Sequence, residues 1–91
     1  MAYVIKTTHR FEKSLDRCVR RGLPMGEFTQ VVRILEKEGK LPRKYKPHKL
    51  TGNRCGQWEC HIRPDWLLVW TQNDRELIIL LLITGSHADL F

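Results

Sequence analysis

The chain has 91 residues and a formal net charge of +6, and 42% of its residues are hydrophobic while 29% are charged. This length suits one small domain over residues 1–91, and the composition excludes an intrinsically disordered chain. The longest apolar run, residues 77–83, is too short to span a bilayer, and three cysteines without C-x-x-C spacing exclude a secreted disulfide framework. We therefore expect a single globular domain in the cytoplasm, with no membrane association.

The first 39 residues carry the signals of one strand and two helices. Residues 3–7 are rich in β-branched and aromatic side chains, which predicts a strand. Apolar residues then recur with a helical period over 11–19 and again over 28–35, and Gly22 and Gly39 end the two predicted helices. Because only a few residues join these helices, we expect an antiparallel helical hairpin.

The rest of the chain predicts one long loop and three strands. Segment 40–54 contains two prolines and little periodicity, which indicates a loop. Strands are predicted at 58–63, 66–70 and 77–83, and the last is continuously apolar, as expected of a central strand covered on both faces. The order β-α-α-β-β-β predicts an α+β fold, in which the helical hairpin packs on one face of a mainly antiparallel sheet.

The positive charge is concentrated in one segment. Residues 37–54 contain seven cations and one anion, whereas the other nine cations and nine anions cancel. Such a segment is typical of proteins that bind polyphosphates, although a solvated surface loop has the same composition. If this segment binds a nucleic acid, we expect four of its cations and one from the following strand to contact the substrate. They are Lys44, Lys46, Lys49 and Arg54 in the segment, and Arg63 in the strand.

Three histidines lie in polar stretches of the second half of the chain, and a carboxylate follows the second of them. In the 58–63 strand, alternation places Glu59, His61 and Arg63 on one face and the apolar side chains on the other. The predicted loop leads into this strand, and the polar residues 84–91 follow the last strand. This topology allows a common site formed by His48, His61, Asp65 and His87. For each histidine taken alone, a surface or hydrogen-bonding role is the alternative.

Histidine can occupy both protonation states near neutral pH. A neutral imidazole can accept a proton from an RNA 2′-hydroxyl, and an imidazolium can donate one to the leaving 5′-oxygen. We predict that His48 and His87 transfer the protons, that His61 and Asp65 position and stabilise, and that no metal or cofactor takes part.

Two further questions remain open: whether the histidines bind zinc, and what the C-terminal aromatic residue does. Zinc is the competing explanation for the histidines, but the spacing of the available ligands fits no common zinc pattern. The ligands considered are His48, Cys55, Cys60, His61 and His87. The terminal Phe91 either stacks on a nucleobase or anchors the end of the chain.

Three sequence blocks point to a known family. They are Leu41-Pro42-x-x-Tyr45-x-x-His48-x-Leu50-x-Gly52, Glu59-x-His61-Ile62-x-Pro64-Asp65-Trp66-Leu67-Leu68 and Thr84-Gly85-Ser86-His87-x-Asp89-Leu90-Phe91. In this order they resemble the YafQ branch of the RelE toxin superfamily. The stretch Arg54-Cys55-Gly56-Gln57-Trp58 departs from the family's usual mix of aromatic and basic residues. This departure affects the details of substrate fit rather than the chemistry.

The resemblance implies a RelE-like fold and a bacterial type II toxin that acts as a ribosome-dependent messenger RNA endonuclease, inhibiting translation and growth. It also implies that His48, His61, Asp65 and His87 carry out cleavage. Phe91 matches an aromatic residue that contributes to activity, and Glu59 falls where the family has an acidic residue near the site.

The implied partners are messenger RNA on the ribosome and a cognate antitoxin of the ribbon–helix–helix type, related to DinJ. Operator DNA is expected to be bound only through the antitoxin complex. Two alternatives remain at this point: a non-catalytic ParE-like toxin of the same fold that binds gyrase, and a basic nucleic-acid-binding module. The histidines argue against the first, and the second predicts that replacing them leaves function intact.

Overall fold

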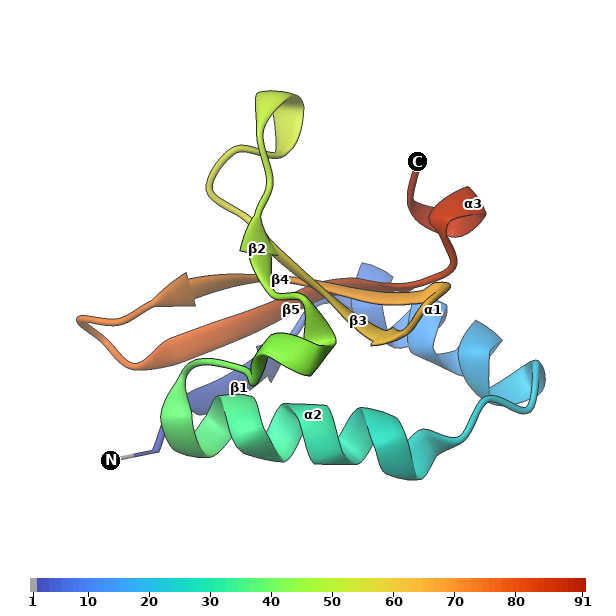
Figure 1. Ribbon diagram of the computed structural model, residues 1–91, viewed down its shortest axis with the longest axis horizontal. Helices are drawn as coiled ribbons and strands as arrows, with labels where there is room; N and C mark the ends of the chain where they lie inside the picture. Colours follow the sequence, from blue (N-terminus) through green and yellow to red (C-terminus); the bar gives the residue numbers. More distant parts are fainter. Residues whose placement is uncertain (1) are drawn as a thin grey trace.

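The computed structural model describes residues 2–91, which form a five-stranded sheet with two long helices on one face (Figure 1). The strands are β1 (Val4–Thr7), β2 (His48–Lys49), β3 (Trp58–Arg63), β4 (Trp66–Asn73) and β5 (Ile78–Gly85), and the helices are α1 (His9–Arg20), α2 (Met25–Glu38) and α3 (His87–Leu90). The sheet order is β1-β5-β4-β3-β2, and only the β1–β5 pair is parallel. The predicted α+β fold is confirmed.

Local sequence explains where α1 begins and where α2 ends. The Thr8 side chain caps α1 by accepting a 3.0 Å hydrogen bond from the backbone N–H of Phe11. Gly39 ends α2 in the left-handed conformation, at φ 68°, and a Cβ there would clash with the ring of Tyr3. The apolar stripes of both helices then pack under the sheet, with Val31 and Leu35 fully buried.

The sheet carries a core on each face, and β4 contributes to both. Its residues Trp66, Leu68 and Trp70 pack toward α1 and α2, whereas Leu67 and Val69 pack with α3 on the opposite face. The strand covered on both faces is therefore β4. The prediction had assigned this position to residues 77–83; β5 is an interior strand, but its alternate residues are only half-buried.

A register shift in β5 directs the C-terminus toward the second face. Val69 pairs with Ile83, but the next residue, Trp70, pairs with Leu81, so Leu82 is left over as a bulge. As a result Ile83 joins the α3 side of the sheet. The chain leaves β5 on this side and turns into α3 (Figure 1).

Two segments contain more structure than the sequence predicts. The predicted loop 40–54 includes β2, which pairs with β3, and two short 3-10 turns, η1 (Arg43–Tyr45) and η2 (Gly52–Arg54). The predicted polar tail 84–91 includes α3. A strand of two residues and a helix of four are too short to show a hydrophobic period, so pattern reading missed both. Across residues 2–91, no helix combines the length and apolarity needed to cross a membrane.

Candidate active site

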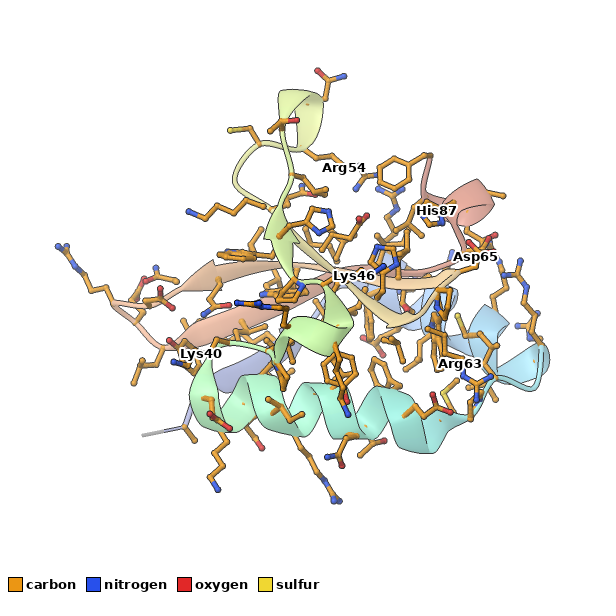
Figure 2. The ribbon with its side chains drawn as sticks, viewed as in Figure 1. Lys40, Lys46, Arg54, Arg63, Asp65 and His87 are labelled. Atoms are coloured by element: carbon orange, nitrogen blue, oxygen red, sulfur yellow. The ribbon has the colours of Figure 1, made fainter. Side chains whose placement is uncertain are left out.

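Three histidines form a row on the face of the sheet opposite α1 and α2. The ring centroids of His48 and His61 are 6.3 Å apart, and those of His61 and His87 are 5.8 Å apart. They come from β2, β3 and α3, three elements that the sheet order and the bulge in β5 bring together. The structure therefore gathers the predicted histidines, and Figure 2 shows Asp65 beside His87.

Asp65 fixes the orientation of His87. Its Oδ1 atom accepts hydrogen bonds from the His87 backbone N–H, at 3.1 Å, and from the ring Nδ1, at 2.8 Å. The hydrogen bonds from the ring and backbone of His87 lower the pKa of Asp65 below its usual value. Because the ionised carboxylate can only accept a hydrogen bond, the Nδ1 atom of His87 carries the hydrogen. The Nε2 atom of His87 has no hydrogen-bond partner among residues 2–91.

His61 is held in the same way by a backbone carbonyl. Its Nδ1 lies 3.2 Å from the Pro64 carbonyl oxygen. A carbonyl oxygen only accepts, so Nδ1 carries the hydrogen and Nε2 holds the lone pair in the neutral ring. Within the described chain, nothing hydrogen-bonds this Nε2 atom.

His48 differs from the other two because both of its ring nitrogens are engaged. Nδ1 lies 2.8 Å from the Lys46 carbonyl oxygen, and Nε2 lies 3.1 Å from Oε1 of Glu59. Glu59 is only 5% exposed, although it lies on the face of β3 opposite the apolar side chains, as alternation predicted. Its register with His48 across β2 and β3 explains this burial, because the imidazole covers the carboxylate.

The predicted substrate-binding cations separate into three groups. Lys44, Lys46 and Arg63 line a cleft of about 220 Å³ that also contains His61. Arg54 lies over the terminal aromatic ring, with its guanidinium 5.3 Å from the centroid of Phe91. That ring is 66% exposed, so its face is accessible to a ligand.

The remaining cation, Lys49, lies elsewhere. It pairs with Trp58 across β2 and β3, and its Nζ lies 5.5 Å from the centroid of that ring. Trp58 packs toward the helices, so Lys49 is on the other face of the sheet from the histidine row.

Arg63 does not share the face of Glu59 and His61 as alternation predicted. The register of β3 shifts between His61 and Arg63, which interrupts the alternation. Arg63 instead makes two hydrogen bonds to the Glu27 carboxylate of α2, at 3.0 and 2.6 Å. This bidentate pair lowers the pKa of Glu27. Arg63 lines the same cleft as His61, and Figure 2 shows it apart from His87.

A carboxylate that the sequence analysis did not select holds α3 in place. Asp89 accepts hydrogen bonds at 2.6 and 3.0 Å from Arg21 of α1, and one of 2.9 Å from the backbone N–H of Ser86. Both contacts lower its pKa, and the bonds from Arg21 are the larger cause. The spacing Ser86-x-x-Asp89 is the sequence signal of this capping box. It positions His87 and Phe91, which lie in and directly after α3.

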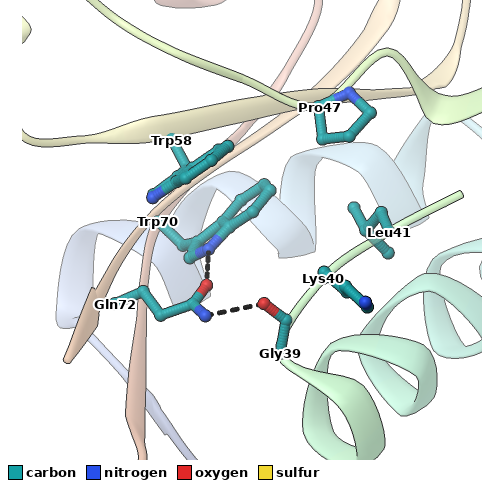
Figure 3. Close-up of a pocket in the computed structure, with 7 residues that line it drawn as sticks. All are labelled: Gly39, Lys40, Leu41, Pro47, Trp58, Trp70 and Gln72. Carbon is teal, nitrogen blue, oxygen red and sulfur yellow. Dashed lines mark hydrogen bonds between the residues drawn. The ribbon is translucent and has the colours of Figure 1, made fainter. Parts of the chain in front are cut away.

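A second cavity lies on the other face and lacks this chemistry. It has a volume of about 160 Å³ and is lined by Trp58, Trp70, Leu41, Pro47, Gln72, Gly39 and Lys40 (Figure 3). Gln72 accepts a 3.0 Å hydrogen bond from Trp70 and donates one of 2.7 Å to the Gly39 carbonyl. These bonds fasten the segment after α2 to β4. No histidine or carboxylate lines the cavity, so we place the candidate site at the histidine row.

A metal centre requires several ligating side chains close together. Among residues 2–91, no three His, Cys, Asp or Glu side chains are arranged to hold a metal ion. Cys18 and Cys60 occupy apolar positions of α1 and β3 and are buried thiols, and burial raises the pKa of Cys60 to about 12. Cys55 is an exposed thiol.

Comparison with known proteins supports one assignment. Residues 3–91 match the model of the family of YafQ bacterial toxins of type II toxin–antitoxin systems. The mRNA interferase toxin YafQ of Escherichia coli K12 is 28% identical over 88 residues, which cover 96% of this chain and 94% of that protein. In the crystal structure of the E. coli DinJ–YafQ toxin–antitoxin complex, the similar chain is 27% identical with a TM-score of 0.89, covering 100% of this chain and 99% of that one.

A metal-bound toxin from Helicobacter pylori is 37% identical, with a TM-score of 0.88 and 100% of both chains covered. The match to the family model spans nearly the whole sequence, including every element of the sheet and all three histidines of the row. The protein belongs to the YafQ family of bacterial type II toxins.

Proposed function

We propose that this protein is a toxin that cleaves messenger RNA on the ribosome and so inhibits translation and growth. The observation that carries the proposal is the pair of imidazoles at His61 and His87. Each is fixed through Nδ1, each has an Nε2 atom without a partner in residues 2–91, and their ring centroids are 5.8 Å apart. A single phosphodiester can bridge two such nitrogens. The name of the E. coli relative, an mRNA interferase toxin, supports the same activity.

In the proposed reaction, His61 is the general base and His87 the general acid. Nε2 of His61 takes the 2′-hydroxyl proton while the 2′-oxygen attacks phosphorus. The bond from phosphorus to the 5′-oxygen breaks, and Nε2–H of His87 protonates that oxygen. The products are a 2′,3′-cyclic phosphate and a 5′-hydroxyl, and each proton transfer contributes about 10²- to 10⁴-fold in rate.

This assignment replaces His48 of the sequence-based pair with His61. Both nitrogens of His48 already contact acceptors of the protein, Lys46 and Glu59, so neither is available to the substrate. Asp65 supports the acid, because its carboxylate stabilises the positive charge of the His87 ring.

The surroundings of the pair suit a single-stranded polyanion. Lys44 and Lys46 line the cleft beside His61, where they can neutralise phosphates. The exposed ring of Phe91, backed by Arg54, offers a stacking surface for a base, worth about 1–3 kcal/mol where such stacking occurs. We accordingly propose that the 220 Å³ cleft and this ring hold nucleotides on either side of the scissile phosphate.

We further propose a cytoplasmic location in a bacterium and a cognate antitoxin related to DinJ, since a similar toxin forms a complex with DinJ. Operator DNA would be bound only through this complex. An antitoxin that covers the histidine row with acidic side chains would complement the net charge of +6.

The experiment that tests the activity is mapping of transcript ends after brief induction. His87→Gln is expected to lower cleavage by about 10²-fold or more, because the acid is lost. His9→Gln is the matched control, since His9 is an exposed histidine at the start of α1, remote from the row. Identical transcript ends with His87→Gln and the parent would contradict the proposal, and intact transcripts with DNA damage would favour the gyrase-binding alternative.

The same assay, run with purified ribosomes, tests whether cleavage needs a metal at the toxin. The proposed proton carriers are side chains, so we expect the rate to persist when the toxin is pretreated with a chelator and returned to magnesium buffer. The metal-bound form of the H. pylori relative makes the comparison informative. A loss restored specifically by a transition metal would replace the acid–base proposal by a metal-dependent one.

A further inference from the structure

One oxygen of a buried carboxylate at the site has no hydrogen-bond partner among the described residues. Oε2 of Glu59 is buried and has no hydrogen-bond partner among residues 2–91, while Oε1 faces His48. A buried ionised carboxylate with an unpaired oxygen is costly, and such groups in native proteins call for an explanation. The contact between the other oxygen, Oε1, and His48 is what can compensate the buried charge.

The two contacts of His48 together require two hydrogens on its ring, or one on the ring and one on Glu59. The carbonyl oxygen of Lys46, 2.8 Å from Nδ1, only accepts, so Nδ1 carries a hydrogen. A neutral ring then has a lone pair at Nε2, which would face Oε1 of Glu59 at 3.1 Å. Two lone pairs repel at this distance, so a second proton has to lie between His48 and Glu59.

We propose that Glu59 and His48 share a retained proton, and that this pair is a positioning device for the catalytic row rather than a proton-transfer pair. The expected effect of this pair on activity rests on the proposed RNA cleavage, whereas the shared proton itself does not. Either form of the pair, imidazolium with carboxylate or imidazole with carboxylic acid, joins the two groups by a hydrogen bond. Glu59 is thus a positioning residue that acts through His48.

The device fixes the segment that flanks the proposed base. His48 links β2 to β3 through Glu59, and it links back to Lys46 through Nδ1. The His48 ring lies 6.3 Å from that of His61, so its position limits how His61 can rotate. Lys46, whose carbonyl the ring holds, lines the cleft beside His61.

The groups around the pair are few. His61 of β3 faces the His48 ring, and the residue opposite Glu59 on β4 is Val69, which is apolar. Lys49 of β2 lies over Trp58 on the other face of the sheet, and Arg54 of η2 lies over Phe91. No other carboxylate contacts His48 within residues 2–91.

Nitrogen-15 NMR of the folded toxin tests the proton directly, without RNA. Near pH 7.5, a value about one unit above the usual titration of histidine, we expect His48 to carry hydrogens on both nitrogens, or Glu59 to be a protonated acid. Observation of a singly protonated His48 beside an ionised Glu59 would overturn the proposal. Because this readout involves no cleavage, it decides the chemistry of the pair even if the proposed function fails.

The functional consequence is tested with Glu59→Leu, which removes the partner of the His48 Nε2 atom, and with Glu59→Gln, whose amide can hydrogen-bond Nε2 without sharing a proton. Cleavage by Glu59→Leu is expected to fall about tenfold or more relative to the parent, because the hydrogen bond that holds the His48 ring is lost. Glu59→Gln should recover a large part of this loss, since a hydrogen bond again positions the ring.

Glu36→Gln is the matched control, because this exposed carboxylate lies on α2, on the other side of the sheet. It should cleave at the parent's rate. Equal cleavage by Glu59→Leu and the parent would contradict the positioning role of Glu59, and so would an equal loss in Glu59→Leu and Glu59→Gln when both keep the parent's thermal stability. Absence of cleavage by the parent would instead reject the proposed function and leave the NMR result standing.

Discussion

Asp65 and His87 show how a single carboxylate sets the chemistry of one side chain. The Oδ1 atom of Asp65 accepts hydrogen bonds from both the backbone N–H and the ring Nδ1 of His87. The ring is therefore held in one orientation, with its Nε2 atom pointing away from Asp65. His61 and His48 have carbonyl or carboxylate partners of their own. At the scale of residues, it is these partners and not the residue type that distinguish the proposed base, the proposed acid and the proposed positioning group.

Replacement of Asp65 tests this reading. Asp65→Asn keeps a side chain of the same size but removes the charge that stabilises protonated His87, so we expect cleavage to fall by about 10²-fold or more. Rate measurement on ribosome-bound messenger RNA provides the check. Asp16→Asn, which removes an exposed carboxylate paired with Arg20 on α1, should cleave at the parent rate. Equal rates for the two variants would rule out the proposed role of Asp65.

At the scale of elements, α3 is too short to be stable by itself and depends on its contacts. A helix of four residues has almost no internal hydrogen bonds, so the capping box and the Arg21–Asp89 pair provide most of its restraint. Leu90 adds apolar contact with Leu67, Val69 and Ile83. The element that carries His87 is therefore held by side chains at a distance of 68 positions in the sequence.

The stability of the protein is expected to depend on the charge of Asp89. Folding lowers the pKa of this carboxyl, so its contribution is present above the pKa of the unfolded chain, about 3.9, and is lost as the pH falls through the lower folded value. Asp89→Asn should lower the free energy of unfolding near neutral pH by about 1–2 kcal/mol, or roughly 4–16 °C in Tm. Thermal melts of parent and variant over a pH series measure this difference.

The two melting curves should converge in acid, where the parent loses the same charge. Arg21→Lys is the companion variant, because lysine keeps the charge but cannot form the bidentate pair. It is expected to show an intermediate loss. A difference that stays constant from neutral to strongly acidic pH would show that the ion pair is not its source.

At the scale of the whole molecule, the proposed catalytic groups occupy one side of the sheet. The helices α1 and α2 cover the other face, so the histidine row, the cleft and the exposed ring of Phe91 all remain accessible (Figure 1). In the proposed function, the net charge of +6 draws a polyanion to the surface, and the cations of the cleft determine where it lies.

Salt dependence of RNA binding tests this division. With a catalytically inactive His87→Gln background, replacing both Lys44 and Lys46 by alanine should reduce the slope of log affinity against log salt concentration by about 1.4, or about 0.7 per phosphate contact on a single strand. Filter binding or fluorescence anisotropy gives the slope. Replacing Lys6 and Lys13, which lie on β1 and α1, is the control of equal charge and should leave the slope nearly unchanged. Equal slopes for the two double variants would place the RNA outside the cleft.

Much of this molecule follows from local sequence. The two long helices, four of the five strands and the buried thiols at Cys18 and Cys60 follow from the local sequence pattern, and the three sequence blocks indicate the family. Periodicity acts within one element, so it predicts which face of a helix or strand is buried. It does not predict where two elements meet.

Only the tertiary structure decided which ring nitrogen of His61 and of His87 is free, that Glu59 is buried against His48, and that Arg63 turns to Glu27. These outcomes depend on strand register, on the bulge at Leu82 and on the shift between His61 and Arg63. A shift of one residue moves a side chain to the other face of a sheet, and hydrogen bonds between distant residues exist only once that register is set. The sequence therefore determined which groups are available for the chemistry, while folding determined the partner, and with it the role, of each.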